Sequence, residues 1–361
     1  MPKGHRDQTP APGAGRRLRL SRLAAGLSQS ELAASAGVSR QAIAGMEGDS
    51  WSPSLSVAMR LAEALRTTVE QLFAPASAPL MVSANPLGPH AEGPVRAQLA
   101  QVFGRWVALP LERDDATQQG FRVATGEIGQ SGTAHWSATG ERSIVVAGCD
   151  PALPLLAGAL PAGPSPWQLC WWSCGSRAAL TLLQEGLVHA AAVHGADRST
   201  LPTKERFARI GFASWAEGVL TAPGPPGTPA RLEELVADGM RLVNRESGAE
   251  ARSLLDRELR RLAIPESAVT GYRSQVSSHM AVAGAIASGL ADFGIATEPV
   301  ALAFGLSFQP LTHEDCVILV SRAHLESPEL AVLLSSLGTG ELNRQLGSLP
   351  GYSLELLGDE V

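Results

Sequence analysis

The sequence predicts a multi-domain protein in which an all-α domain of five helices precedes an α/β domain of two lobes. Leucines at helical spacing dominate residues 16–75, whereas continuous apolar runs typical of buried strands alternate with helices after residue 143. A stretch rich in Pro, Ala, Ser and Gly separates the two regions. The length of 361 residues suits two or three domains, and a hydrophobic content of 45% excludes a fully disordered chain.

These patterns divide the chain into segments. We expect a disordered tail at 1–15, a helical domain at 16–75, a linker at 76–94, a small β-rich connector at 95–142, the α/β domain at 143–345 and a C-terminal tail at 346–361. Within the α/β domain, we expect lobe I at about 143–220 plus 305–345, and lobe II at about 221–304.

The charge of the chain is unevenly distributed. Residues 1–75 carry nine Lys/Arg and six Asp/Glu, whereas the whole chain has a net charge of −6. A basic head on an acidic body is typical of a nucleic-acid-binding module fused to another domain. The alternative is that the arginines only solvate a helix face.

The helical domain contains two short helices joined by a tight turn. Ser28 is a good N-cap, and Glu31 three residues later completes a capping box. Gly37 ends that helix, and the next runs from Ser39 through Glu47. Further helices are expected over 16–26, from Ser54 to about 65, and over 69–73. This arrangement predicts a helix-turn-helix.

The segment LSQSELAASAGVSRQAIAGMEGD, residues 27–49, resembles the phage-repressor type of helix-turn-helix, the XRE/Cro family. The resemblance covers about residues 16–73 and implies double-stranded DNA as the partner. It places the third helix in the major groove, with its first residues on the base edges. A homodimer is expected, because a single head binds weakly and operator half-sites occur in pairs.

Side chains around that third helix have the chemistry for DNA contacts. Arg40 can read guanine, and Gln41 can read adenine. Gln29, at the start of the second helix, can hold a phosphate, and Ser39 can contact phosphate or base. We expect sequence-independent attraction from the arginines of the first helix, namely Arg19 together with Arg16, Arg17 and Arg22.

In the α/β domain several strands end in a small polar turn that begins a helix. Such helix beginnings direct free backbone N–H groups outward and bind anions or polar ligands. We expect four of these turns, two from each lobe, to meet around one cleft; they lie at 149–151, 174–176, 245–249 and 277–279.

The α/β region also resembles the type II periplasmic-binding-protein fold in the form that is fused to regulators. The resemblance covers about 143–345 and is carried by GCDPAL at 148–153, GSRAAL at 175–180, VNR at 243–245, SHMAVA at 278–283 and ASGLADFG at 287–294. Related domains bind molybdate or tungstate, so the resemblance implies an oxyanion effector. The ligand-binding residues carried over or expected at the turns are Cys149, Asp150, Cys174, Gly175, Ser176, Arg245, Ser247, Gly248, Ala249, Ser278, His279 and Thr297.

Departures from the family pattern leave the effector open. The expected Gly-Ser-Gly-Thr-Arg run is replaced by residues 247–252, SGAEAR, and Cys149 stands where a hydroxyl is expected. Asp150 and Glu246 would repel an anion if they faced the cleft. The alternatives are a small organic acid, or an α/β domain that binds no ligand and serves as an oligomerisation scaffold.

Other functional classes have less support. The four Cys do not follow a CxxC-pair zinc pattern, so no metal or certain cofactor is predicted. A redox pair of Cys149 and Cys174 is the alternative role for these thiols. Serine-hydrolase, Walker and zincin motifs are missing from the sequence, so we do not expect an enzyme. Because no apolar run reaches ~18 residues and no leader opens the chain, we expect a cytoplasmic protein that does not enter a membrane.

Overall fold

The structure is a computed structural model that describes residues 14–50, 52–73, 80–111, 124–129, 131–136, 142–162, 166–195, 202–224 and 231–361. The chain separates into two compact units, unit 1 at Met1–Leu80 and unit 2 at Met81–Val361. The predicted tail at 1–15 lies outside the described residues except for Ala14 and Gly15, which begin the first helix. Among the described residues, every helix is too short or too polar to span a bilayer.

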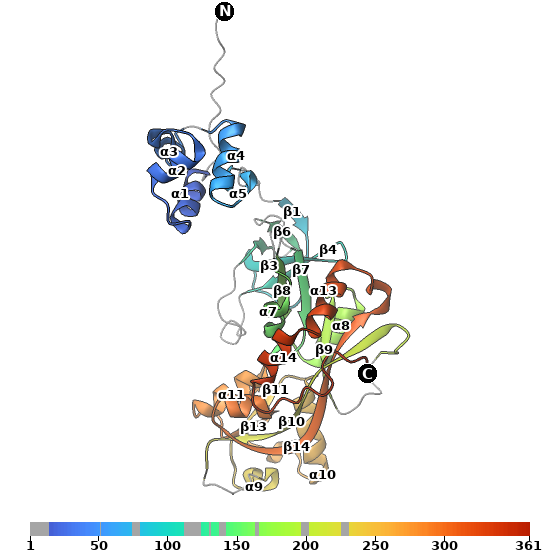
Figure 1. Ribbon diagram of the computed structural model, residues 1–361. Coiled ribbons are helices and arrows are strands. Elements are labelled where there is room, and N and C mark those ends of the chain that lie inside the picture. The colour runs from blue at the N-terminus through green and yellow to red at the C-terminus, as the bar shows by residue number, and fades with distance from the viewer. Residues whose placement is uncertain are drawn as a thin grey trace, which may run out of the picture. The chain divides into compact units, whose positions relative to one another are not determined.

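The described part of unit 1 is the predicted bundle of five helices (Figure 1). They are α1 at Ala14–Ala24, α2 at Gln29–Ala36, α3 at Arg40–Glu47, α4 at Leu55–Ala64 and α5 at Val69–Phe73. The capping box of Ser28 and Glu31 is present at the start of α2, and Gly37 ends that helix in the left-handed conformation. Gly15 lets α1 approach α3, because a Cβ there would lie 2.4 Å from the carbonyl oxygen of Met46.

Unit 2 begins with a six-stranded sheet of order β1-β6-β5-β3-β4-β2. Its strands are β1 at Leu80–Ser83, β2 at Asn85–Pro86, β3 at Val95–Val102, β4 at Arg105–Pro110, β5 at Gly126–Ile128 and β6 at Thr133–Trp136. Two strands of this sheet therefore lie within the expected linker, 76–94. Leu87, Val102 and Leu109 share a core with Val145 and Leu319, so the sheet packs on lobe I instead of forming a separate connector.

The second sheet has eight strands in the order β12-β11-β13-β10-β14-β9-β7-β8. The strands are β7 at Arg142–Ala147, β8 at Trp167–Trp172, β9 at Ala190–Val193, β10 at Phe207–Thr221, β11 at Leu242–Arg245, β12 at Gln275–Val276, β13 at Phe293–Thr297 and β14 at Ser307–Ser321. Parallel pairs lie toward both ends of the sheet, but β10 and β14 pair antiparallel in its middle.

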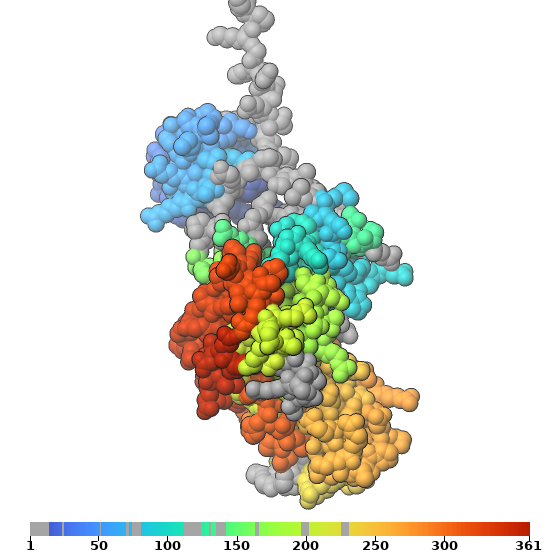
Figure 2. Space-filling model, turned by 90° about the vertical axis from the view of Figure 1, so that its right-hand side faces the viewer, coloured from blue at the N-terminus to red at the C-terminus, as the bar shows by residue number. Residues whose placement is uncertain are grey.

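Helices cover this sheet in two groups that define the lobes. Lobe I carries η1 at Leu153–Leu155, α7 at Leu156–Ala159, α8 at Ser176–Gln184, α13 at Pro328–Leu337 and α14 at Gly340–Gly347. Lobe II carries α9 at Leu232–Ala237, α10 at Glu250–Arg261, α11 at His279–Ala287 and α12 at Glu298–Ala303. Short 3-10 turns, η3 at Glu266–Ala268 and η4 at Arg322–His324, complete the set. In Figure 2 the orange residues of lobe II form a mass beside the green and red residues of lobe I.

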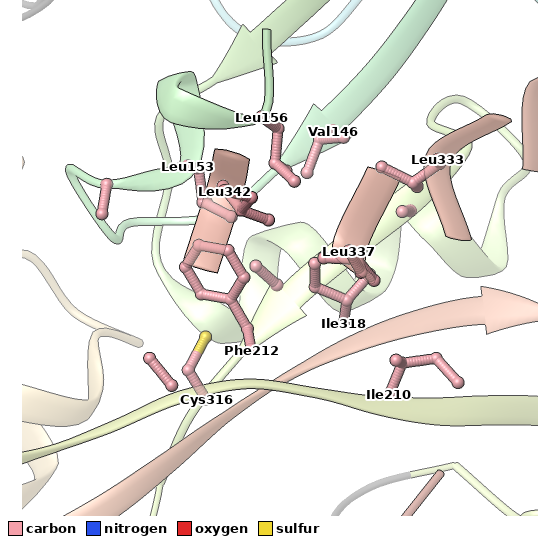
Figure 3. Packing of buried hydrophobic residues seen from close by; sticks show 14 of the residues in the cluster. Val146, Leu153, Leu156, Ile210, Phe212, Cys316, Ile318, Leu333, Leu337 and Leu342 are labelled. Carbon is pink, nitrogen blue, oxygen red and sulfur yellow. The ribbon is translucent and has the colours of Figure 1, made fainter. Parts of the chain in front are cut away.

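Each lobe has its own apolar cores. In lobe I, Phe212, Ile318, Leu333 and Leu337 pack with Leu342 beneath α13 and α14 (Figure 3). In lobe II the cores lie under α10 and α11. The multi-domain, two-lobed α/β prediction is thus confirmed.

The strands β10 and β14 connect the lobes through one continuous ladder. Their register runs from Phe207 opposite Ser321 in lobe I to Thr221 opposite Ser307 beside β13 of lobe II. The first half of β14 therefore belongs with lobe II, where Phe308 packs, although we expected 305–345 in lobe I.

The expected C-terminal tail is a packed part of lobe I. The backbone N–H of Gly211 in β10 donates to the carbonyl oxygen of Asp359 at 2.8 Å, and Ser214 and Ser353 exchange two bonds of 2.8 Å. Gly211 permits this contact, because a Cβ there would lie 1.9 Å from the carbonyl oxygen of Leu356.

Candidate functional site

Helix α3 of unit 1 presents a polar face to its surroundings. Ile43 and Met46 are buried on its inner side, whereas Arg40 and Gln41 are exposed. The hydroxyl of Ser39 caps the helix, accepting a hydrogen bond from the N–H of Ala42 at 3.0 Å. Arg40 and Gln41 are therefore available for a partner, whereas the Ser39 hydroxyl oxygen already accepts a hydrogen bond from the helix backbone.

Two residues that we expected at the DNA are held inside unit 1. The guanidinium of Arg22 is buried and pairs with the Glu47 carboxylate at 2.6 Å. The side-chain amide of Gln29 donates to the same carboxylate at 2.9 Å. Burial acts against ionisation of Glu47, but these donors lower its pKa. The expectation for Arg22 is therefore wrong and the Gln29 side chain is engaged, whereas Arg19 is exposed.

In unit 2, several of the predicted turns meet where the lobes touch. A Cβ on Gly175, before α8, would lie 3.4 Å from the Cα of Ala249 and 3.5 Å from the carbonyl oxygen of Gly248, both in lobe II. Gly175, Ser247 and Gly248 line a pocket of about 410 Å³ together with Trp172 and Arg177. Residues of the predicted 174–176 and 245–249 turns therefore lie together.

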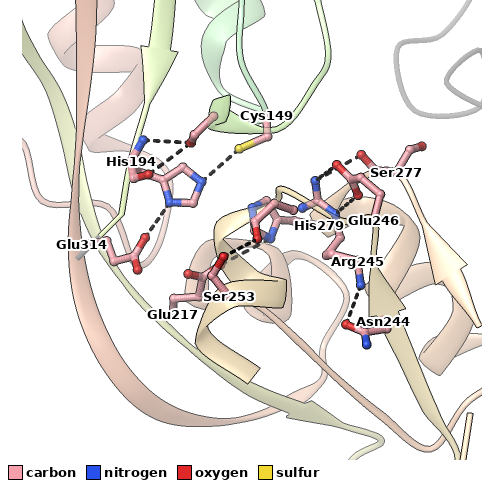
Figure 4. Close-up of polar contacts among 12 residues, drawn as sticks. Cys149, His194, Glu217, Asn244, Arg245, Glu246, Ser253, Ser277, His279 and Glu314 are labelled. Atoms are coloured by element: carbon pink, nitrogen blue, oxygen red, sulfur yellow. Dashed lines mark hydrogen bonds and ion pairs between the residues drawn. The ribbon is translucent and has the colours of Figure 1, made fainter. Parts of the chain in front are cut away.

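His194, just after β9, is the centre of a buried polar cluster (Figure 4). Its Nε2 lies 3.0 Å from the Sγ of Cys149, which follows β7. Its Nδ1 lies 2.5 Å from the Glu314 carboxylate in β14. Ser176, at the start of α8, bonds both backbone groups of His194 through its hydroxyl at 3.1 Å. The ring is therefore held at both of its nitrogens, and the backbone that carries it is held by Ser176.

Lobe II contributes a buried cation and a second imidazole. The Arg245 side chain at the end of β11 is 1% exposed, pairs with Glu246 at 2.8 Å and donates to the carbonyl oxygen of Ser277. His279 is the first residue of α11, whose N-cap is Ser278. The rings of His279 and His194 lie 5.8 Å apart, centroid to centroid.

Strand β10, which connects the two lobes and is called the hinge strand below, places Glu217 in the same cluster. The side chain is fully buried, and its Oε1 lies 3.8 Å from the Nδ1 of His279. The ladder with β14 shifts register between Glu217 and Gly218, an irregularity of the kind that redirects side chains next to binding sites.

Many polar atoms here have no hydrogen-bond partner among the described residues. They are both oxygens of Glu217, both ring nitrogens of His279, the Nη1 of Arg245, the Oγ1 of Thr297, the Oδ2 of Asp150 and the Nε1 of Trp215. Each such buried group typically costs about 1–3 kcal/mol. The concentration of these atoms between the lobes indicates a place where a further species supplies the missing interactions.

The environment shifts the ionisation of the cluster strongly. Burial raises the pKa of Glu217 to about 8, and the neighbouring Glu314 adds to this effect. Burial lowers the pKa of His279 well below its ordinary value, assisted by the charge of Arg245. For His194 burial acts in the same direction, but Cys149 and Glu314 overcome it and raise the pKa well above the ordinary value.

Other predicted ligand residues have structural roles beside the cluster. Asp150 accepts hydrogen bonds from the Ala152 N–H at 2.7 Å and from the Tyr352 hydroxyl at 2.7 Å. Thr297 is the buried N-cap residue of α12, without a side-chain capping bond. Cys174 is half-buried against the lobe I core, and all four cysteines are free thiols.

Sequence reasoning missed His194, Glu217 and Glu314. His194 directly follows the short apolar strand β9 and carries no motif. Glu217 interrupts an apolar strand pattern, which is a weak signal in the sequence, whereas Glu314 stands in the polar run at 312–315 and offers none. Next to the cluster, Ser176 and His194 also line a pocket of about 440 Å³ whose other residues include Arg177, Lys204, Arg209, Glu250 and Arg257.

Comparisons with known proteins agree with this two-part architecture. A helix-turn-helix domain model matches residues 14–73, and a PBP superfamily domain model matches residues 157–338, just over half of the chain. The uncharacterized protein YvgK of Bacillus subtilis is 31% identical over 161 residues, 44% of this chain and 51% of YvgK. The match thus spans about half the length of that relative.

Two further proteins are similar over part of the chain. An uncharacterized protein encoded in the 5′ region of a 2Fe-2S ferredoxin gene of Clostridium pasteurianum is 31% identical over 109 residues, 30% of this chain and 96% of that protein. Among solved structures, the effector binding domain of QuiR in complex with shikimate is 11% identical, covers 58% of this chain and 99% of that chain, and has a TM-score of 0.43.

Proposed function

The chain belongs to the PBP superfamily and carries an N-terminal helix-turn-helix domain of the XRE type, and from this premise we propose that it is a DNA-binding regulator that senses a small ligand. In this proposal unit 1 binds the operator and the cluster between the lobes of unit 2 binds the effector. A DNA-binding module joined to an effector-binding type of domain is the architecture of a regulator.

The buried unsatisfied cluster is the observation that carries the effector half of the proposal. Arg245, His279 and Glu217 come from three different elements, and all three keep polar atoms without partners at full burial. A species bound there would contact both lobes and the strands that connect them. Its binding would then favour one arrangement of the lobes over another, as ligand-controlled switching requires.

A thermal-shift panel on the full chain tests this half. A ligand that is present at a free concentration of about 100 times its dissociation constant should stabilise the protein by about 2.7 kcal/mol. The panel should contain molybdate, tungstate, small organic acids and divalent metal ions. Stabilisation by none of them, at saturating concentration, would favour the ligand-free scaffold instead.

An oxyanion such as molybdate or tungstate is one candidate effector. The free Nη1 of Arg245 and the free Oγ1 of Thr297 are donors that such an anion needs. Acidic groups oppose this candidate, because Glu217, Glu314 and Asp150 are all buried in or beside the cluster. Molybdate stabilisation that is lost in Arg245→Met would support it.

The DNA half is tested by selection of binding sites from random duplexes. Arg40→Ala and Gln41→Ala should each relax sequence preference by roughly 1–3 kcal/mol, because base-edge contacts carry selectivity. Arg19→Ala should instead weaken binding to all duplexes alike and reduce the salt dependence. Unchanged selectivity in the first two variants would contradict our assignment of the recognition residues.

A further inference from the structure

We propose that the buried cluster between the lobes binds one divalent transition-metal ion through Cys149, His194 and His279, with Glu217 as the fourth ligand. The ion would be the effector of the regulator proposed above. That regulatory role rests on the proposed function, whereas the metal site itself rests on the geometry of unit 2.

The donor atoms lie close enough to share one ion. One ligand atom from each of Cys149, His194 and His279 lies within 4.8 Å of the others, and the same holds for His194, Glu217 and Glu314. Sulfur and nitrogen ligands of a tetrahedral zinc ion are roughly 3.5 Å apart, given bond lengths of about 2.3 and 2.0 Å. Small side-chain movements would therefore bring Cys149, His194 and His279 to one ion. Glu217, whose Oε1 lies 3.8 Å from the Nδ1 of His279, would turn toward the same ion to complete the site.

His194 is already oriented as a metal ligand. Its Nδ1 is held by the Glu314 carboxylate at 2.5 Å, and this directs its Nε2 toward the Sγ of Cys149 at 3.0 Å. Metal-binding histidines in proteins are usually held in this way by a carboxylate on the other ring nitrogen. Glu314 is thus a positioning residue, which would orient His194 without contacting the ion itself.

An ion would also satisfy groups that the protein leaves unpaired. His279 and Glu217 are fully enclosed, and neither has a hydrogen-bond partner for its side-chain nitrogens or oxygens among the described residues. The 3.8 Å between their nearest atoms is too long for a hydrogen bond. An ion bound to a nitrogen of His279 and an oxygen of Glu217 would remove both deficits.

The donor set selects the class of ion. A thiol sulfur with two imidazoles favours zinc, cobalt, nickel or copper over magnesium or calcium, which prefer oxygen ligands. The cluster also holds two buried carboxylates that would balance the charge of a cation: Glu314 is paired with His194, and Glu217 lies 3.8 Å from His279. The charge of the neighbouring Arg245 is paired with Glu246.

The ligands also link the parts of unit 2 that would have to move. Cys149 and His194 belong to lobe I, His279 belongs to lobe II, and Glu217 lies on the hinge strand β10. A bound ion would therefore hold the two lobes and the hinge in one arrangement.

The first experiment measures metal content. Full-length protein is treated with a chelator, incubated with zinc sulfate or cobalt chloride, desalted and analysed by mass spectrometry for metals. We expect one ion per chain, and for cobalt both tetrahedral visible bands and a thiolate-to-cobalt charge-transfer band. Cys149→Ser should abolish the charge-transfer band, and Glu314→Gln should weaken binding about 10–100-fold. His279→Gln should weaken binding at least as much.

Matched variants separate ligation from general damage. Cys170→Ala and His313→Ala change a buried cysteine and an exposed histidine outside the cluster, and both should retain one ion. Circular dichroism of all metal-free variants should match the wild type. Absence of stoichiometric metal in the wild type, or full retention in folded Cys149→Ser and His279→Gln, would overturn the metal site.

DNA binding with and without zinc distinguishes the two proposals. A change in affinity for a selected duplex that is lost in His279→Gln supports the ion as effector. One bound ion with unchanged DNA affinity overturns the effector role and leaves the metal site standing. A protein that binds one ion but selects no duplex overturns the proposed function instead.

Discussion

At the scale of single residues, burial decides what each polar side chain does. Arg22 looks in the sequence like its neighbours Arg16 and Arg19, yet it is 7% exposed and serves the Glu47 carboxylate. Helical spacing places it on the inner side of α1, but only the fold supplies the acid it pairs with. For this reason the sequence could show that the first helix is rich in arginine, but it could not tell which of these arginines are free to contact DNA.

His189 illustrates the same rule and predicts a pH dependence. It is fully buried, its Nδ1 accepts the Val145 N–H at 2.9 Å, and burial lowers its pKa to about 3. Unfolding restores a pKa near 6.5, so the unfolded chain takes up a proton below that pH while the folded chain does not. Stability is therefore fully present above pH 6.5 and falls as the pH drops toward 3.

Urea unfolding at pH 7.5 and 5.5, followed by tryptophan fluorescence, measures this effect. From pH 7.5 to 5.5 the free energy of unfolding of the wild type should fall by about 1 kcal/mol more than that of His189→Asn. The amide oxygen of the Asn can still accept the Val145 N–H. The exposed His313→Asn serves as the control and should behave as the wild type. An equal change in the free energy of unfolding with pH for the wild type and His189→Asn would contradict the lowered pKa of His189.

At the scale of elements, the sequence predicted most helices and their caps. Ser28, Ser39 and Ser54 each cap the helix that the sequence predicts to begin there, because capping is a local interaction that the adjacent residues determine. The pairing of β10 with β14 was missed, since their residues are about 100 positions apart and no local pattern reports that contact. Glu217 and Glu314 were missed for the same reason.

The packing of the C-terminal segment on β10 gives a prediction for one glycine. Gly211→Ala would bring a methyl group against the carbonyl oxygen of Leu356, and should destabilise unit 2 by roughly 1–3 kcal/mol. Gly224→Ala is the matched control, because nothing lies within 4 Å of a Cβ at that position. Chemical unfolding of the full chain compares them, and equal midpoints would argue against tight packing at Gly211.

At the scale of the whole molecule, the sequence indicated both functional halves but only part of the site. Motif-bearing turns such as 174–176 and 245–249 did meet, although the strands before them, β8 and β11, lie near opposite ends of the eight-stranded sheet and belong to different lobes. The chemistry at their meeting point depends on residues from β9, β10 and β14 that carry no motif. Domain type was therefore readable from sequence, and the effector class was not.

The helix-turn-helix domain at residues 14–73 leads to a prediction about assembly. We expect two chains to bind one duplex, with half-sites about 10 base pairs or a multiple apart, because one head buries too little surface for specific binding. Sedimentation of a fluorescent selected duplex with increasing protein should reach two chains per duplex. Saturation at one chain, with full selectivity, would contradict the dimer.

The ladder of β10 and β14 limits how the lobes can move. Its register shifts twice, between Gly211 and Ala213 and again between Glu217 and Gly218, and Trp215 stands between these irregularities. A hydrogen-bonded ribbon resists sliding but flexes where its pairing is interrupted. Motion between the lobes is therefore confined to a bend and twist of this short span, and the residues that line it would sense every opening of the domain.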